Sequence, residues 1–324
     1  MSHNSLFEFP EVSKQQVKIK VFCDESGTVE PPWLYFGVLL VPESVEDALL
    51  TNLLNSRCNN PLRQKSWSDC ELGCAQHNKN NTEVHFSEIR PSKKYKYDVA
   101  NRWIHYFLKD VQIVYLYILG IDLSKLDTSY FGDDRVRDNI YNRFFRTALL
   151  ISSKSFFSDF KTIQITRVVH DKNPSLETHT YFKWYPILTI GEQDTKVSFI
   201  DPNIIFIDSD HRNSGNPHSH FIQFVDLILS CTRCCVDYSP EINELKTALS
   251  LKASRLVKRL LKEPGNTRSS YKYVGRLKIQ FFPKFDVSNL DENSLIYQLK
   301  RFDSFYTDRI LSIENRGQLQ LFNV

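Results

Sequence analysis

The sequence predicts an α/β fold, a mixed sheet with flanking helices followed by a basic C-terminal extension. Two apolar runs of strand length, 17–24 and 33–41, are separated by a glycine and a proline pair. Helical and strand patterns then alternate along the chain, which indicates layered α/β architecture. With 41% hydrophobic and 13% aromatic residues, the 324-residue chain can bury a substantial core.

The first strand, 17–24, places Lys18, Lys20, Phe22 and Asp24 on one face, with Val17, Ile19, Val21 and Cys23 on the other. The second strand, 33–41, is apolar on both faces and should be central; the short turn between the two predicts an antiparallel hairpin. The later elements expected are helices at 44–55, 94–108, 138–157, 177–188 and 220–236, an extended piece at 83–86, and strands at 111–121, 162–169 and 203–208.

This order of strands and helices is that of a ribonuclease H-like sheet. We expect one domain over 16–238, with an inserted loop at 58–82, and a helical and strand extension over 239–324 packed on it.

The longest apolar runs, such as 113–121, have the length of strands rather than of membrane spans. The first residues lack the basic and apolar stretches of a signal peptide. These features predict a cytoplasmic protein without membrane contact, whose seven cysteines are reduced thiols or metal ligands rather than disulfides.

Four acidic residues follow strands or precede a helix. Asp24 closes the first strand, Asp171 and Asp208 end two later strands, and Glu88 lies just before the helix at 94–108. Each alone is better explained as a turn or capping residue. Together they predict a carboxylate site, because α/β sheets place ligands at the carboxyl ends of strands.

Asp226 is the acid that most needs explaining. Its helix is apolar almost all round, so the side chain should be buried, and a buried carboxylate is costly unless it is paired or binds metal. A narrow polar stripe crosses the helix at spacings of four and three residues: Ser219, Gln223, Asp226, Ser230 and Arg233. A salt bridge with Arg233 is the structural alternative.

Carboxylates suit Mg²⁺ or Mn²⁺. Two such ions roughly 4 Å apart would activate a water and stabilise the leaving oxygen in phosphodiester cleavage. We therefore expect Asp24, Asp171 and Asp226 as metal ligands and catalytic residues, with Glu88 completing the catalytic set and Asp208 as a further metal ligand.

The segment Cys23-Asp24-Glu25-Ser26-Gly27 resembles the opening motif of the bacterial family called domain of unknown function 3800. The later segments 206–209 and 221–228 are similar to that family's strand and its Gln-x-Ala-Asp helix, with Val225 in place of the usual Ala. The resemblance spans about residues 17–238. It implies a ribonuclease H-like fold and a nuclease site at Asp24, at Asp208 or Asp171, and at Asp226; Glu88 is a weaker match.

The segment 246–284 holds eleven Lys and Arg against one acid, although the chain as a whole carries a net charge of only +3. Ordinary solvated faces mix both signs, so this imbalance favours contact with a phosphate backbone. The expected nucleic-acid contacts are Lys252, Arg255, Arg259, Lys262, Arg268, Lys272 and Arg276.

Six of the seven cysteines lie in two groups. Cys58, Cys70, Cys74 and His77 are loosely compatible with a structural Zn²⁺ site but lack a paired Cys-x2-Cys knuckle, so we favour free thiols in a loop. Cys231, Cys234 and Cys235 are expected to be small core residues.

The leading hypothesis is a Mg²⁺- or Mn²⁺-dependent nuclease acting on DNA or RNA. A second is a catalytically inactive ribonuclease H-like module of a bacterial defence system that binds nucleic acid or a protein partner. A third is a structural acidic cluster neutralised by Arg233, Arg167 and Arg212.

Overall fold

The structure is a computed structural model, which describes residues 14–27, 33–58, 81–109, 113–132, 136–172, 195–201, 203–237, 243–262 and 275–283. The sheet contains β1 (Lys14–Ser26), β2 (Trp33–Pro42), β3 (Tyr115–Asp122), β4 (Phe160–Asp171), β5 (Val197–Phe199), β6 (Ile204–Ile207) and β7 (Leu277–Phe282). The helices are α1 (Glu46–Arg57), α4 (Lys94–Lys109), α5 (Val136–Phe156), α8 (His211–Ser214), α9 (Ser219–Val236) and α10 (Glu244–Lys262). Short 3-10 turns, among them η2 (Phe86–Glu88) and η5 (Thr128–Phe131), connect them.

The described strands form one seven-stranded mixed sheet in the order β5-β4-β1-β2-β3-β7. Strand β6 also pairs with β4, nearer the carboxyl end of β4 than β5 does. Strand β2 pairs antiparallel with β1 and β3, whereas β4 runs parallel to β1 and β7 parallel to β3. The predicted α/β class, the antiparallel hairpin and the central place of β2 are therefore confirmed. Because β1, β3, β4, β6 and β7 share one direction, their carboxyl ends lie along the same edge.

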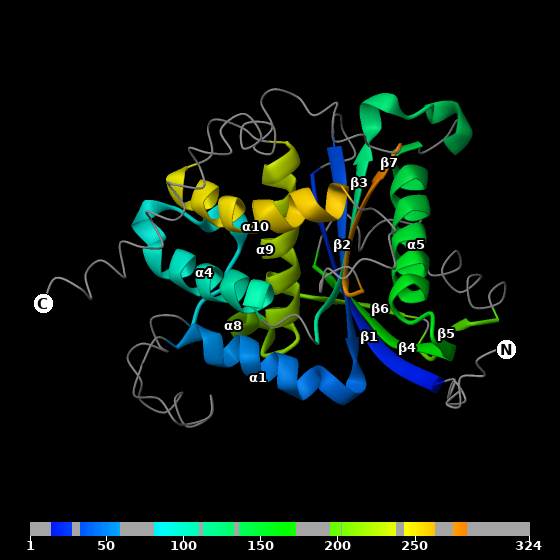
Figure 1. Cartoon of the computed structure of the whole chain (residues 1–324), viewed down its shortest axis with the longest axis horizontal. Helices are drawn as coiled ribbons and strands as arrows, with labels where there is room; N and C mark the ends of the chain where they lie inside the picture. The colour runs from blue at the N-terminus through cyan, green and yellow to red at the C-terminus, as the bar shows by residue number, and fades with distance from the viewer. Residues whose placement is uncertain are drawn as a thin grey trace, which may run out of the picture.

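Two cores cover the two faces of the sheet. On one face α1, α4, α9 and α10 pack over Phe22, Tyr35 and Leu39, and on the other α5 packs over Ile19, Val21 and Phe36. Figure 1 shows the two layers, with α1, α4, α9 and α10 on one side of the strands and α5 on the other. The alternation predicted for β1 is thus confirmed: Phe22 points to α9, and Val21 and Cys23 point to α5.

Several elements differ from the prediction. Strand β3 begins at Tyr115 rather than at 111, and the three-residue β5 and four-residue α8 are too short to leave a periodic signal. The extension contributes more than a packed appendage: β7 is a strand of the sheet, and α10 packs against α9 and α4. The helix expected at 177–188 lies outside the described residues.

No helix within these described ranges is long and apolar enough to cross a membrane.

Candidate carboxylate site

Strand β1 delivers Asp24 to the face covered by α9. Asp24 pairs with Gly37 of β2, two residues after Phe22 on the same face, and its side chain is only 7% exposed. Its Oδ1 accepts a hydrogen bond from the backbone N–H of Glu25 at 2.8 Å. Beyond β1, Gly27 takes a φ of +98°, where a side chain would collide with the Trp33 carbonyl. The glycine therefore lets the chain turn immediately after the acidic tip.

Helix α9 supplies Asp226, which is 6% exposed. Every residue of α9 except Arg233 is buried, as its sequence predicted. Oδ2 of Asp226 accepts the backbone N–H of Phe86 at 2.8 Å, and Oδ1 accepts the Ser230 hydroxyl at 3.2 Å. The rest of the polar stripe is also engaged, since Ser219 bonds the Asp208 carbonyl and Gln223 bonds Arg57 and the Val84 N–H.

Strand β4 brings the third carboxylate. Val169 packs in the α9 core and His170 faces α5, so strand alternation returns Asp171 to the α9 face. Its neighbour in register is the end of β1, because Cys23 pairs with His170. Asp24 and Asp171 therefore end adjacent parallel strands on one face, with α9 packed over β1.

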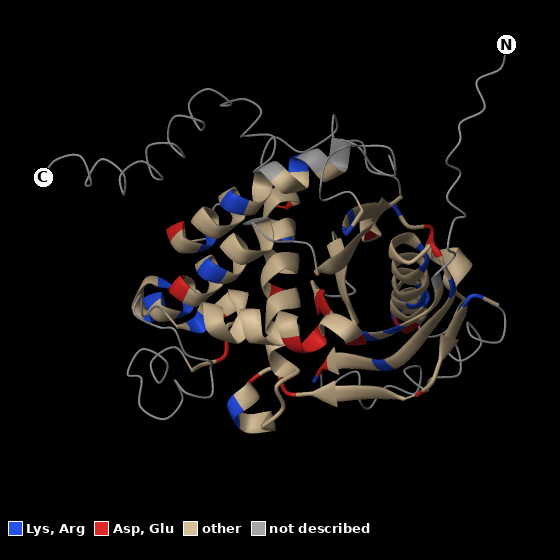
Figure 2. Ribbon diagram, turned by 60° about the horizontal axis from the view of Figure 1, so that its bottom comes forward, with Lys and Arg blue, Asp and Glu red and all other residues tan. Residues whose placement is uncertain are grey.

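The electrostatics show that these acids interact. Burial raises the pKa of Asp24 well above its ordinary value, and the negative charges of Asp226, Glu25 and Asp171 raise it further. Burial also raises the pKa of Asp171, to about 6. Three of the sequence-predicted carboxylates are thus brought together, from β1, β4 and α9. Figure 2 shows acidic residues gathered near the middle of the molecule.

Among the described contacts, none of the three arginines considered from sequence pairs with this cluster, although His170 lowers the pKa of Asp171. Arg233 donates to the Ser26 hydroxyl and lies 3.8 Å from Asp237, while Arg212 pairs with Asp210. Arg167 is exposed on β4. His85 lies near Asp226, with its Nδ1 3.9 Å from Oδ2. The neutralisation by three arginines considered from sequence is not seen.

Two other expected acids are engaged elsewhere. Glu88 lies on the same short turn as Phe86, but its carboxylate pairs with Lys93 at 2.7 Å and with Lys96. The expectation that Glu88 completes the carboxylate site is therefore corrected: in this structure its carboxylate is paired with two lysines instead. Asp208 accepts the backbone N–H of Asp210 at 2.8 Å, which is a turn-capping role.

Sequence reasoning did not find His85 as a neighbour of Asp226. The segment 83–88 is tied to α9 at two points, since Gln223 accepts the Val84 N–H and Asp226 accepts the Phe86 N–H. These contacts join residues about 140 positions apart, and no local pattern signals them. His85 itself accepts the backbone N–H of Ser87 at 3.2 Å through Nδ1, so in the neutral ring Nε2 carries the proton.

The basic residues expected to bind nucleic acid are only partly described. Lys252 is exposed on α10 and contacts Asn101, and Arg276 lies over the ring of Tyr115 at 5.0 Å. Arg276 is therefore half-buried, with its guanidinium against the Tyr115 ring. The side chains of Arg255, Arg259 and Lys262, and residues Arg268 and Lys272 entirely, lie outside the described part.

Neither cysteine group forms a described metal site. Cys58 is half-buried just after α1, and Cys70, Cys74 and His77 lie outside the described residues. Cys231, Cys234 and Cys235 are buried free thiols, as expected of core residues.

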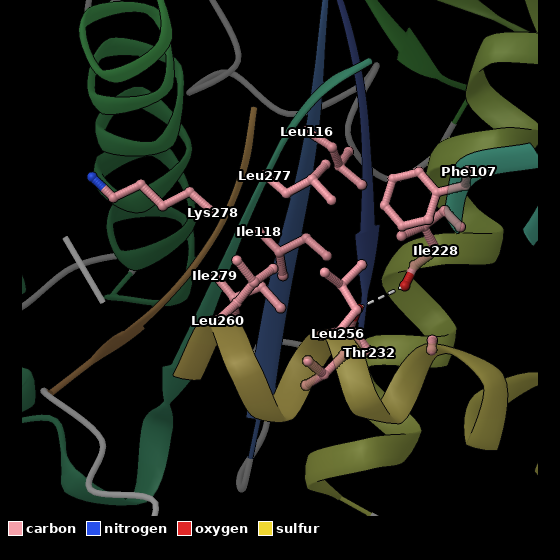
Figure 3. Close-up of a pocket in the computed structure, with 12 residues that line it drawn as sticks. Phe107, Leu116, Ile118, Ile228, Thr232, Leu256, Leu260, Leu277, Lys278 and Ile279 are labelled. Carbon is pink, nitrogen blue, oxygen red and sulfur yellow. Dashed lines mark hydrogen bonds between the residues drawn. The ribbon is translucent and has the colours of Figure 1, made fainter. Parts of the chain in front are cut away.

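A small cavity of about 20 Å³ lies between α9, α10 and strands β3 and β7. Figure 3 shows its lining, which is almost wholly apolar and includes Phe107, Leu256 and Ile279. A space of that size holds about one water, and an apolar lining gives a water no partners. The cavity is a packing gap and not a substrate site.

Within the described ranges no three His, Cys, Asp or Glu side chains are arranged to hold a metal ion as they stand. The donor chemistry nevertheless fits Mg²⁺ or Mn²⁺, because Asp171 and Asp226 lie close enough to Asp24 to raise its pKa, and the described residues give Oδ2 of Asp24 no hydrogen-bond donor. No family model matches the chain, and no curated protein and no solved structure matches it either.

An Asp171→Asn substitution is expected to flatten the pH dependence of stability. The folded carboxyl, with its pKa of about 6, keeps its proton to higher pH than the unfolded one at 3.8. The wild type therefore loses stability as the pH rises from about 4 to about 6, by at most about 3 kcal/mol at 1.36 kcal/mol per pKa unit. Urea unfolding across this range measures the slope, and equal slopes in the two proteins would contradict the assignment.

Proposed function

We propose that the protein is a divalent-cation-dependent nuclease whose metal ligands are Asp24, Asp171 and Asp226. The observation that carries the proposal is that Asp171 and Asp226 lie near enough to buried Asp24 to raise its pKa, at the carboxyl ends of β1 and β4, without a described Lys or Arg ion-pair partner. Burying acids that repel one another is unfavourable, so such an arrangement needs a cation or protons to offset it. The resemblance to the domain-of-unknown-function family is in keeping with this choice.

In this proposal some residues bind the metal ion and others orient its ligands. Asp24, Asp171 and Asp226 would hold Mg²⁺ or Mn²⁺, which supplies Lewis-acid activation of a water and stabilisation of the leaving oxygen. The backbone N–H of Phe86 and the Ser230 hydroxyl orient the Asp226 carboxylate from two sides. A cytoplasmic location and contact with nucleic acid belong to the same proposal.

His85 is suited to move a proton at this site. It lies beside Asp226 and is partly exposed, and its Nδ1 is held by Ser87, so that Nε2–H is the group available to a leaving oxygen. We expect His85→Gln to lower kcat on the order of 10²-fold while leaving the Mn²⁺ Kd nearly unchanged. The control is His105→Gln, which removes an exposed histidine from α4. A His85→Gln enzyme with full kcat would exclude this role.

Exposed aromatic rings occur along the same edge of the sheet. Phe282 ends β7 and is 47% exposed, and Tyr130, in η5 after β3, is 76% exposed. Phe144 connects the two regions, with its ring 5.1 Å from Phe282 and 6.0 Å from Phe131. Exposed rings offer stacking surfaces for unpaired bases.

A Tyr130→Ala variant is therefore expected to bind a single-stranded oligonucleotide more weakly, by about 1–3 kcal/mol if one base stacks on the ring. Fluorescence anisotropy with a labelled oligonucleotide in EDTA measures the Kd. Ile200→Ala, which removes an exposed apolar side chain after β5, serves as the control. If both variants bind as the wild type does, this edge does not contact the strand.

The proposed function is tested by incubating single- and double-stranded DNA and RNA with the protein in Mg²⁺, in Mn²⁺ and in EDTA. We expect cleavage of at least one substrate with metal, and none with EDTA or with Asp24→Ala. Asp159→Asn removes an exposed carboxylate before β4 and should cleave normally. Binding without cleavage in every condition would favour the inactive nucleic-acid-binding module instead.

A further inference from the structure

A second polar cluster lies directly behind the carboxylates, on the α5 face of the sheet. It joins Glu25 of β1, His170 of β4 and Tyr141 of α5, all of them largely buried. The Glu25 carboxylate lies 3.1 Å from Nε2 of His170 and accepts the Tyr141 hydroxyl at 3.3 Å. Tyr141 also lies 3.2 Å from Nε2 of His170. Each strand residue of this cluster is the chain neighbour of a carboxylate on the opposite face.

Hydrogen bonds connect the three side chains of this cluster to one another and to the backbone. Nδ1 of His170 lies 2.9 Å from the backbone carbonyl of Asp171, which can only accept, so Nδ1 carries a proton. The Tyr141 hydroxyl donates to Glu25 and also lies within hydrogen-bond distance of Nε2 of His170. Glu25, Tyr141 and Nε2 of His170 therefore form one buried cluster of polar contacts, in which each group restrains the other two.

The contact between Glu25 and His170 joins the carboxyl ends of β1 and β4. Cys23 and His170 are register partners in the parallel β1–β4 pairing, so the bond from Glu25 to His170 crosses between the strands at their last paired residues. On the other face the ends carry Asp24 and Asp171, whose negative charges repel each other. The bond of His170 to the Asp171 carbonyl also restrains the backbone of that ligand.

From this geometry we infer that Glu25, His170 and Tyr141 are positioning residues, which clamp the ends of β1 and β4 from behind so that Asp24 and Asp171 meet at one cation. The inference rests on the proposed function for its catalytic meaning, but the clamp itself can be tested without metal. It also explains why a glutamate follows Asp24: strand alternation turns it away from the site and toward α5.

The test compares Glu25→Gln and Tyr141→Phe with Leu149→Val, a truncation elsewhere in the same α5 core. Hydrogen exchange in EDTA reports on peptides covering 21–27 and 167–172. We expect both cluster variants to exchange roughly tenfold faster there, relative to the rest of the sheet, because the strand ends open locally. Leu149→Val should lower protection without singling out these ends.

Calorimetric titration with Mn²⁺ then separates positioning from general stability. Loss of a group that orients a ligand weakens metal affinity by about 10–100-fold, so we expect at least a tenfold higher Kd in both cluster variants and less than a twofold change in Leu149→Val.

Unchanged hydrogen exchange at the strand ends overturns the clamp, and faster exchange with an unchanged Kd overturns its positioning role. If the wild type binds no Mn²⁺, the proposed function fails while the exchange result still decides the clamp. Tyr141→Phe, which removes one hydroxyl, keeps the test valid should Glu25→Gln fail to fold.

Discussion

An Asp24→Asn variant is expected to be more stable than the wild type in metal-free buffer, by about 1–3 kcal/mol at pH 8, the range for relieving an unsatisfied buried polar group. Asp24 is buried, and its pKa is raised by burial and by three neighbouring acids. The folded carboxyl therefore holds its proton to higher pH than the unfolded one, so the wild type loses stability as the pH rises above the unfolded pKa of 3.8. Asn has no proton to lose, and the advantage of the variant should grow from pH 5 to pH 8.

Urea unfolding in EDTA at the two pH values measures this difference. Asp159→Asn is the matched control, because its carboxylate is exposed and bonds only Ser158 among the described residues. A residue whose removal stabilises the protein is retained for a reason other than folding, so stabilisation by Asp24→Asn would support a functional role. An Asp24→Asn protein that is less stable at both pH values would show that the carboxylate serves the fold.

A second large effect on stability and on metal binding is expected from Gly37→Ala. Gly37 pairs with Asp24, and a Cβ placed on it would lie 2.7 Å from Cγ1 of Val225 and 3.3 Å from Cδ2 of Leu229. Gly37→Ala should therefore push α9 away from the sheet and destabilise the protein by about 1–3 kcal/mol, the usual range for overpacking a core. Because Asp226 follows Val225, the same shift should move Asp226 away from Asp24 and weaken Mn²⁺ binding.

Val225→Ala in the same chain is expected to restore much of the stability and affinity, since it removes the atom that the new Cβ meets. The four proteins of this cycle give a coupling energy between the two sites from urea unfolding. Gly275→Ala is the control, because a Cβ there meets no atom of the described residues within 4 Å. Equal destabilisation in the single and double variants would show that the close approach of α9 does not position Asp226.

Much of the site could be predicted because its signals are local. Alternation in β1 separates Asp24 from Glu25, and the observed faces agree with it. An acid in an otherwise apolar helix predicted a buried Asp226, which is what α9 contains. These inferences need only the period of the element and the polarity of its neighbours.

The parts that were missed depend on contacts between distant segments. Glu88 looked available in sequence, but the helix that follows folds two lysines back onto its carboxylate. His85 reaches Asp226 only because α9 accepts the N–H groups of Val84 and Phe86. Strand β7 alternates Leu277 and Ile279 with Lys278 and Gln280, yet it stands in a basic segment that was interpreted by its charge. Gly37 gave no signal, since nothing in β2 indicates that α9 approaches it closely.

The central claim is that Asp24, Asp171 and Asp226 together bind a divalent cation, and Mn²⁺-dependent stabilisation tests it most directly. For a single site, Mn²⁺ at 100 times its Kd should raise the free energy of unfolding by about 2.7 kcal/mol. The measurement is urea unfolding of the wild type, Asp226→Asn and Asp159→Asn, each with Mn²⁺ and with EDTA. We predict stabilisation of the wild type and Asp159→Asn, and little or none of Asp226→Asn. The same Mn²⁺ effect in all three proteins, or none in the wild type, would contradict the claim.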